Sequence, residues 1–170
     1  MDRKREEIKV INDIDNLFEN AEKLVEIGQF QLSELLLERV VHLEKDNIKI
    51  LNLYAYVNFM LKNYTIAKEI NEKILKINHN DIYANKGLGL TLCKLGEVEK
   101  GIDYLKNAVK LTDYNYMDPY HDCAATLMEH DKMDEAKSIL EQARHMSLDF
   151  VKANKDLYDK LNISAIGKEK

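Results

Sequence analysis

The residues best suited to metal chemistry in this chain are His121, Cys123 and His130, which lie within one short stretch. Imidazole nitrogens and thiolates are common zinc ligands. A helix across this stretch would point His121 and Cys123, which are two positions apart, toward different faces. Cys123 also occupies an apolar position of a repeating pattern described below. We therefore expect a core cysteine here and no metal site.

The remaining candidates for chemistry are a second thiol and pairs of carboxylates. Cys93 is followed by Lys94, which favours a thiolate, but no histidine lies beside it to act as a base. Carboxylate pairs such as Glu97 and Glu99 fall on solvated faces or turns. The sequence contains no phosphate-binding loop, no Gly-x-Ser-x-Gly and no His-Glu-x-x-His motif. We expect neither catalysis nor a bound cofactor.

Composition and charge restrict the class of partner. The 170 residues are 45% hydrophobic and 32% charged, which is typical of a folded, soluble chain. A formal net charge of -5 argues against nucleic acid or an anionic membrane as the main partner, because both need a basic surface. The charged N-terminal segment lacks the apolar core of a signal peptide, and no apolar run suits membrane insertion. With two cysteines expected as reduced thiols, these features predict a cytoplasmic protein.

An internal period of 34 residues organises the sequence. Ala21, Ala55 and Gly89 follow one another at this interval, and Ala124 follows 35 residues later, after a single insertion. Three further columns recur in the same way: Ser33, Ala67, Gly101 and Ala136; Val40, Ile74, Ala108 and Ala143; and Leu43, Ile77, Leu111 and Met146. The chain therefore divides into four repeats, at 14–47, 48–81, 82–115 and 117–150.

The period and its small residues resemble the tetratricopeptide repeat (TPR) family. That family has small residues at repeat positions 8 and 20, bulky apolar residues at positions 4, 7, 11 and 24, and glycine near position 15. The third repeat supplies Leu88, Gly89, Leu92, Gly96, Gly101, Leu105 and Ala108, and the fourth supplies Tyr120, Cys123, Ala124, Leu127, Ala136, Leu140 and Ala143. The second repeat departs from the pattern at Asn58, Lys62 and Asn71, and the family's proline at position 32 is missing from all four repeats.

The resemblance implies an all-α, right-handed TPR solenoid of antiparallel helix pairs with a C-terminal capping helix. We expect helices at 14–27, 30–44, 48–61, 64–77, 82–95, 98–111, 118–130 and 133–146, with a capping helix at 150–162 and a flexible tail at 163–170. Residues 1–13 form a helical extension or, alternatively, a separate turn broken at Asn12 and Asp13.

Glycines at positions 8 and 20 let the two helices of a repeat approach closely. Position 101 lies inside a helix, and the family prefers alanine there. We therefore expect Gly101→Ala to stabilise the helix by about 0.5–1 kcal/mol. Gly87 has no role in the pattern, so it either widens the inner surface or is neutral.

The resemblance also places a binding surface on the first helix of each pair, at positions 2, 5, 9, 12 and 13. The predicted groove residues are Phe18, Lys49, Asn52, Tyr56, Phe59, Met60, Tyr83, Lys86, Leu90, Lys94, His121 and Met128. They predict a protein-interaction adaptor that binds a peptide segment of another protein, with lysines selecting acidic flanks. The alternative is a chaperone-like protein that shields an apolar client segment, as in bacterial secretion chaperones. The sequence leaves open whether the N-terminal segment or the cap covers the groove, and whether the chain associates with itself.

One known TPR binding mode is excluded by the residue types. TPR co-chaperones that hold a C-terminal carboxylate use lysine, asparagine and arginine at five positions of their first three repeats. In this chain those positions carry Phe18, Glu22, Leu53, Tyr83 and Gly87. None of these side chains matches, and Glu22 would repel a carboxylate.

Overall fold

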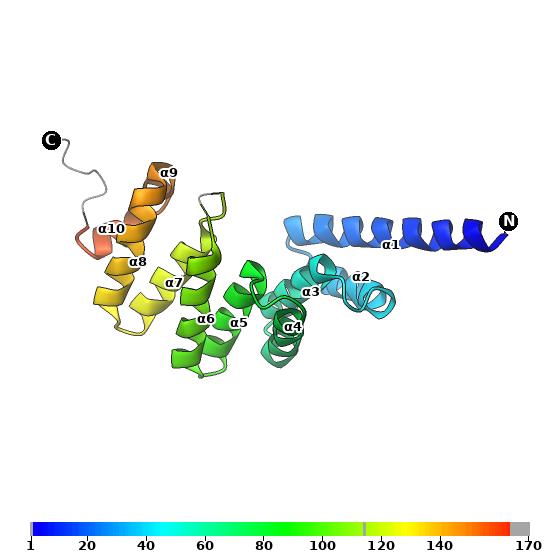
Figure 1. Ribbon diagram of the computed structural model, residues 1–170, viewed down its shortest axis with the longest axis horizontal. Helices are drawn as coiled ribbons and strands as arrows, with labels where there is room; N and C mark the ends of the chain where they lie inside the picture. Colours follow the sequence, from blue (N-terminus) through cyan, green and yellow to red (C-terminus); the bar gives the residue numbers. More distant parts are fainter. Residues whose placement is uncertain (1, 114, 164–170) are drawn as a thin grey trace. The chain divides into compact units, whose positions relative to one another are not determined.

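The computed structural model describes residues 2–113 and 115–163, with side chains from residue 13 onward, and these residues form ten helices and no strand (Figure 1). The helices are α1 (Asp2–Glu26), α2 (Phe30–Leu43), α3 (Ile48–Met60), α4 (Tyr64–Ile77), α5 (Ile82–Lys94), α6 (Val98–Leu111), α7 (Asp118–Glu129), α8 (Met133–Met146), α9 (Leu148–Ala153) and α10 (Lys155–Lys160). The predicted all-α class of consecutive helix pairs is confirmed.

The two ends of the chain differ from the simplest expectation. At the N-terminal end, α1 continues unbroken through Asn12 and Asp13, which excludes a separate turn there. At the C-terminal end, two short helices replace the single expected cap helix. The side chain of Ser147 caps the start of α9 by accepting a hydrogen bond from Phe150 N (3.1 Å), and Asn154 Nδ2 donates to Phe150 O (2.9 Å). Asn154 ends α9 and precedes α10, with φ -113° and ψ 28°. Apart from Ile163, the predicted tail lies outside the described residues.

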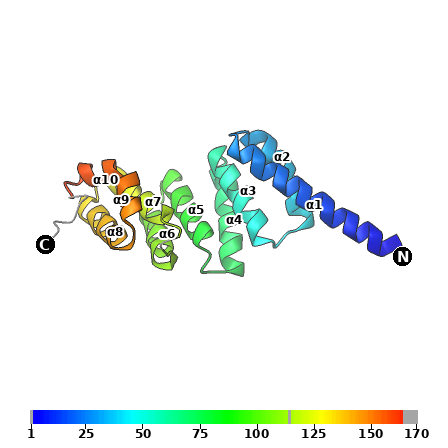
Figure 2. The same cartoon turned by 90° about the horizontal axis from the view of Figure 1, so that it is seen from above.

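The chain divides into two compact units, Met1–Gly87 and Leu88–Lys170, with the boundary inside α5. In the first unit α1 packs against α2 and α3 against α4 (Figure 2). The small residues meet where the pattern expects them, because Ser33 Oγ donates to Ala21 O at 3.0 Å between α2 and α1. Two clusters of buried side chains fill this unit, one around Leu37 and Val57 and one around Leu51 and Ile74.

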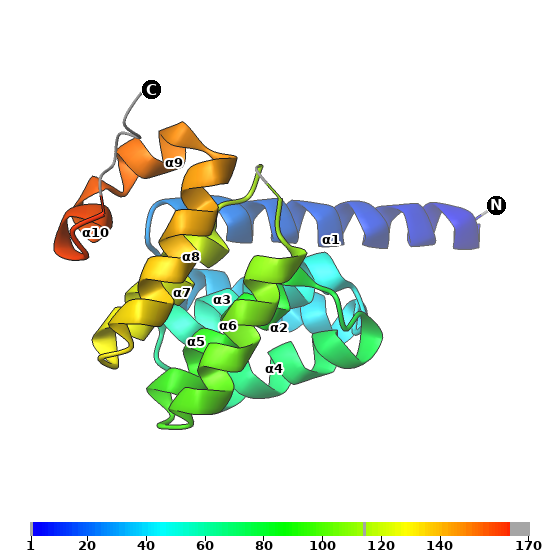
Figure 3. The ribbon, with the colours of Figure 1, turned by 60° about the vertical axis from the view of Figure 1, so that its left-hand side comes forward.

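The second unit contains the helix pair α7 and α8, with α9 following from α8 (Figure 3). A single apolar cluster joins the repeat helices to the cap, and it includes Leu127, Leu140, Phe150, Tyr158 and Ile163. The Tyr158 hydroxyl donates to Leu140 O at 2.8 Å, and the Tyr158 side chain is fully buried. The cap is therefore part of this unit's core.

The turn inside every repeat adopts the same left-handed backbone, whether or not it contains glycine. The residues at position 15 are Gly28 (φ 74°), Lys62 (φ 64°), Gly96 (φ 86°) and Asp131 (φ 58°). In each case the next residue's N–H returns to a carbonyl five residues earlier, as in Gln29 N to Leu24 O (2.8 Å), which is the Schellman ending of a helix. The loss of glycine at Lys62 thus leaves the turn geometry unchanged.

Gly89 and Gly101 face each other across α5 and α6 more tightly than the sequence pattern predicts. A Cβ placed on Gly101 would lie 2.6 Å from the Gly89 carbonyl oxygen and would also clash with Cys93 Sγ. A Cβ on Gly89 would lie 2.8 Å from the Gly101 carbonyl oxygen. Backbone atoms cannot retreat as a flexible side chain can, so the expectation that alanine at position 101 stabilises the helix is wrong.

Two departures from the repeat pattern, Asn71 and Gly87, explain each other. Asn71 occupies an apolar position on α4, is 2% exposed, and donates from Nδ2 to Ala67 O at 2.9 Å. A Cβ on Gly87 would lie 3.0 Å from both the Oδ1 and the Nδ2 atoms of Asn71. The missing side chain at position 87 therefore makes room for the buried amide, and neither of the two sequence-based explanations of Gly87 is needed.

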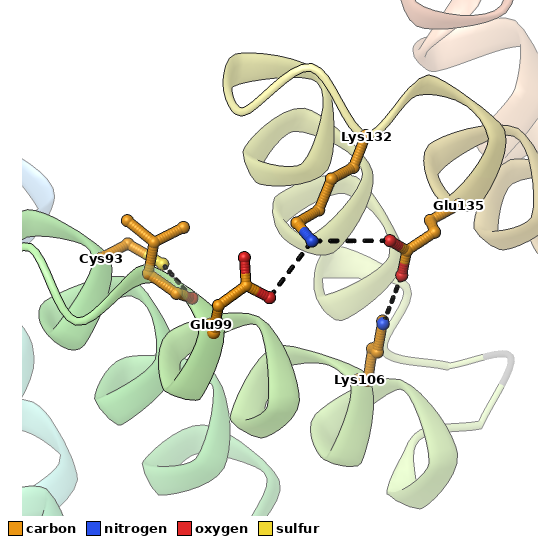
Figure 4. A network of polar contacts seen from close by, with 6 residues as sticks. Cys93, Glu99, Lys106, Lys132 and Glu135 are labelled. Atoms are coloured by element: carbon orange, nitrogen blue, oxygen red, sulfur yellow. Dashed lines mark hydrogen bonds and ion pairs between the residues drawn. The ribbon is translucent and has the colours of Figure 1, made fainter.

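A chain of charged side chains connects α6 to α8 and to the turn before α8 (Figure 4). Lys106 Nζ lies 2.5 Å from Glu135 Oε2, and Lys132 Nζ lies 3.1 Å from Glu99 Oε2 and 3.7 Å from Glu135 Oε1. The hydrogen bond from Lys106 lowers the pKa of Glu135 below its ordinary value of 4.5. The hydrogen bond to Glu99 raises the pKa of Lys132 above its ordinary value of 10.5.

These pKa shifts predict how the network's contribution to stability depends on pH. Because the folded pKa of Glu135 is lowered, its contribution is complete above the unfolded pKa and is lost as the pH falls through the folded pKa. The contribution of Lys132 is complete below its unfolded pKa and is lost as the pH rises through its raised folded pKa. We expect Glu135→Gln to lower the urea midpoint at neutral pH, and the difference from the parent chain to shrink in acid and in high salt.

The control for this experiment is Asp103→Asn, which removes an exposed carboxylate from α6 that is outside the network. It should change the urea midpoint little at any pH. An unchanged gap between Glu135→Gln and the parent chain from neutral pH to acid would contradict the prediction.

Candidate interaction surface

The structure separates the residues that suggested metal chemistry. His121 is exposed and its Nδ1 lies 3.2 Å from Asp122 Oδ1, whereas Cys123 is fully buried. Among the side chains that the structure describes, from residue 13 onward, no three His, Cys, Asp or Glu side chains are grouped closely enough to hold a metal ion. The described helices also include none with the length and apolar character needed to cross a bilayer.

Neither thiol is set up as a nucleophile. Burial raises the pKa of Cys123 to about 12. Burial also raises the pKa of Cys93, and this effect outweighs the opposing influence of Lys94 that the sequence suggested. The Cys93 side chain lies against α6, with Sγ 3.8 Å from Val98 O. Because the thiolate is the reactive form, both groups are poor nucleophiles at neutral pH.

The most exposed group of large apolar side chains on the first helices of the pairs lies on α3. Its outward face carries Lys49, Leu53, Tyr56 and Met60, spaced by four, three and four residues, so that they line one side of the helix. Tyr56 is 46% exposed and Met60 is 41% exposed, while Leu53 is half-buried. We call Leu53, Tyr56 and Met60 the apolar stripe. Tyr83, at the start of α5 in the same unit, is 54% exposed.

Aromatic neighbours pack against α3 and support the apolar stripe. The Tyr56 and Phe30 rings pack edge to face, with ring centroids 6.2 Å apart. Phe59, one position before Met60, is half-buried and packs on Tyr64 with centroids 5.5 Å apart. The side of α3 beneath the stripe is buried through Val57 and Asn58. The exposed Tyr56 ring is thus held by a packed base.

Comparison with solved structures identifies the fold that this arrangement of helices forms. No family model matches the sequence, and no curated protein matches it. A thermophilic TPR protein of Thermus thermophilus is 17% identical in sequence, with a TM-score of 0.74 over 87% of this chain and 82% of that chain. The chain has a tetratricopeptide repeat fold.

Two further structures of low sequence identity to this chain show the same TPR arrangement of helices. MamA of Desulfovibrio magneticus RS-1 is 21% identical, with a TM-score of 0.66 over 77% of this chain and 73% of that chain. The first TPR domain of Spaghetti, bound to the HSP90 peptide SRMEEVD, is 14% identical, with a TM-score of 0.61 over 69% of this chain and 93% of that chain. At these identities the comparisons show the fold.

The structure corrects the placement of Phe18 among the predicted groove residues of the TPR surface. Phe18 is 7% exposed and belongs to the core of the first unit, where Lys49 Nζ lies 4.5 Å from the centre of its ring. Phe18 follows Ile14 by four residues and precedes Ala21 by three, so it lies on the buried face of α1. Asn52 is half-buried, and its Nδ2 donates to Asp81 Oδ1 at 3.2 Å. Asp81 in turn accepts from Ala84 N (2.8 Å), which makes this contact a helix cap.

The other predicted residues are divided between the two units. In the first unit Lys49 is exposed but paired with Glu22 (3.3 Å), and Lys86 is half-buried. In the second unit Leu90 and Met128 are half-buried against the apolar core, whereas Lys94 and His121 are exposed. Tyr56, Met60 and Tyr83 are therefore the predicted residues that combine apolar character with high exposure.

The predicted groove positions did not include position 6, which carries Leu53 on α3 and Glu19 on α1. Leu53 belongs to the apolar stripe, and Glu19 lies on the equivalent face of α1 with Asp15, Glu22 and Glu26, which hold the predicted positions 2, 9 and 13. The signal was present in the spacing, since positions 2, 6, 9 and 13 line one side of a helix.

Proposed function

We propose that this chain is a protein-interaction module that binds a segment of a partner protein on the outward face of its first helices, with the apolar stripe of α3 as the anchor. The observation that carries the proposal is the exposure of Tyr56, Met60 and Tyr83 within one unit. The exposed Tyr56 ring, held against Phe30, loses little conformational freedom on binding, which is typical of binding hot spots. A peptide bound to a TPR domain of similar fold supports the same kind of use.

The experiment that tests this function starts by identifying the partner. A photo-crosslinking phenylalanine analogue placed at Tyr56, in the cells of origin, would join the chain to whatever lies against the stripe. Mass spectrometry of the crosslinked product then gives the partner segment. The same analogue at Leu35, which is exposed on α2, reports background contacts.

The affinity measurement uses the partner segment with substituted chains. We expect Tyr56→Ala combined with Met60→Ala to weaken binding at least tenfold, because each anchor of this kind commonly contributes about 2 kcal/mol or more. The far-ultraviolet circular dichroism should not change, since both side chains are exposed. Met60 is a better second site than Phe59, whose removal would also break the packing on Tyr64.

The matched control removes two apolar side chains that are at least as exposed as Met60 from the second helices of the pairs, as Leu35→Ala combined with Ile66→Ala. This variant should bind as tightly as the parent chain. If the control loses as much affinity as the stripe variant, or if the stripe variant binds normally, the outward face of α3 is not the site.

A further inference from the structure

The face of α1 that corresponds to the apolar stripe of α3 is entirely acidic. Asp15, Glu19, Glu22 and Glu26 follow one another at intervals of four, three and four residues, which aligns them along one side of the helix. We call these four residues the acidic stripe. Asp15, Glu19 and Glu26 are exposed, and Glu22 is half-buried. Like charges at these spacings destabilise a helix, so the arrangement is not explained by the stability of α1.

The acidic stripe and the outward face of α3 border one another. Lys49 begins that face of α3, and its Nζ lies 3.3 Å from Glu22 Oε1 of the acidic stripe. A hollow between the two helices is lined by Asp15 and Phe18 from α1 and by Lys49 and Ile50 from α3. A segment lying against the apolar stripe would therefore pass beside the carboxylates of α1.

Lys49, which lies next to both stripes, does not make this surface positively charged. Lys49 is matched by Glu22, whereas Asp15, Glu19 and Glu26 form no ion pair with any side chain that the structure describes. The surface therefore keeps an excess of negative charge beside its apolar residues. These carboxylates would repel the acidic flanks that the sequence led us to expect.

We propose, building on the proposed function, that the bound partner segment is basic: it carries lysine or arginine on the side that meets the acidic stripe and apolar residues on the side that meets Leu53, Tyr56 and Met60. The apolar contacts supply the affinity. The carboxylates select the partner and speed its association, and they do so less in high salt. An acidic segment with the same apolar residues is rejected by the unpaired charges of α1.

Two synthetic peptides test the proposal on the full chain. Both are amphipathic, with leucines at helical spacing. They differ only at the remaining positions, which are lysine in one peptide and glutamate in the other. Fluorescence anisotropy of labelled peptides should show binding of the lysine peptide, weakening as salt is added, and at least tenfold weaker binding of the glutamate peptide. Comparable binding of both peptides, or of neither, would overturn the proposal.

Charge reversal at two matched pairs of positions separates the effect of the acidic stripe on binding from the effect of the chain's net negative charge. Glu19→Lys combined with Glu26→Lys should weaken binding of the lysine peptide at least tenfold. The control, Glu38→Lys combined with Glu69→Lys, makes the same change in net charge at exposed positions of α2 and α4 and should have little effect. Equal losses in the two variants would mean that only net charge attracts the peptide, and the acidic stripe would have no specific role.

The variant Tyr56→Ala with Met60→Ala separates the failure of this inference from the failure of the proposed function. If it loses the lysine peptide while charge reversal of the acidic stripe has no effect, the apolar anchor stands and the basic partner is wrong. If it binds the lysine peptide like the parent chain, the anchor itself is wrong and the proposed function fails with it. Circular dichroism of every variant confirms that the helices are retained.

Discussion

Gly101→Ala, a substitution that usually stabilises a helix, should here lower the free energy of unfolding by about 1–3 kcal/mol. The added Cβ would lie 2.6 Å from the carbonyl oxygen of Gly89, so α5 and α6 must move apart to accept it. This cost exceeds the gain of about 0.5–1 kcal/mol that alanine provides over glycine in a helix. Gly89→Leu should be more harmful, because its side chain would meet Leu105 as well as the Gly101 backbone.

Urea unfolding followed by circular dichroism measures both effects. Asp103→Ala provides the control, since it also introduces alanine into α6, at an exposed position, and should change stability by less than about 0.5 kcal/mol. A Gly101→Ala chain as stable as the Asp103→Ala chain would show that the two helices are not in backbone contact. A tolerated leucine at position 89 would contradict the repeat register as well.

Removal of the cap, by ending the chain before Phe150, should lower the melting temperature strongly and cause aggregation. The deletion removes Phe150, Val151, Leu157, Tyr158 and Ile163 from the core of the second unit. Each large apolar side chain of this kind contributes about 1.5–3 kcal/mol when it is fully buried. The deletion also exposes the flank of α8, and terminal repeats need a polar outer face to stay soluble.

Two further chains make the cap experiment specific. A chain that ends at Ile163 keeps all of these buried residues and should melt like the full chain. Tyr158→Phe removes only the hydroxyl that donates to Leu140 O, and it should cost about 0.5–1.5 kcal/mol. A chain without the cap that remains monomeric and melts unchanged would show that the segment is only a tail.

The sequence alone determined the repeat and the class of fold. The period of 34 residues and the apolar spacing within it predicted seven helices beyond the first to within one residue at each end. This succeeds because the helical period is written locally, in side chains three and four residues apart. The four turns followed as well, and Lys62 and Asp131 adopt the same left-handed backbone as Gly28 and Gly96.

The candidate surface could be predicted only in part. Tyr56, Met60 and Tyr83 were identified from their repeat positions, and they are exposed in the structure. Phe18, at the predicted groove position 5 of the first repeat, is buried, because its ring packs into the core beneath Lys49. Repeat position fixes the side of a helix from which a residue leaves the backbone. The neighbouring helices decide how much of that side is covered.

Contacts between residues far apart in the sequence were decided by the tertiary structure alone. Gly87 makes room for the amide of Asn71, Gly89 meets the backbone of Gly101, and Lys49 pairs with Glu22, in each case across two helices. A single sequence shows the composition of each helix face but not which face meets which. The acidic stripe of α1 was therefore visible in the sequence as a row of carboxylates, but its position beside the outward face of α3 required the packing of one helix against another.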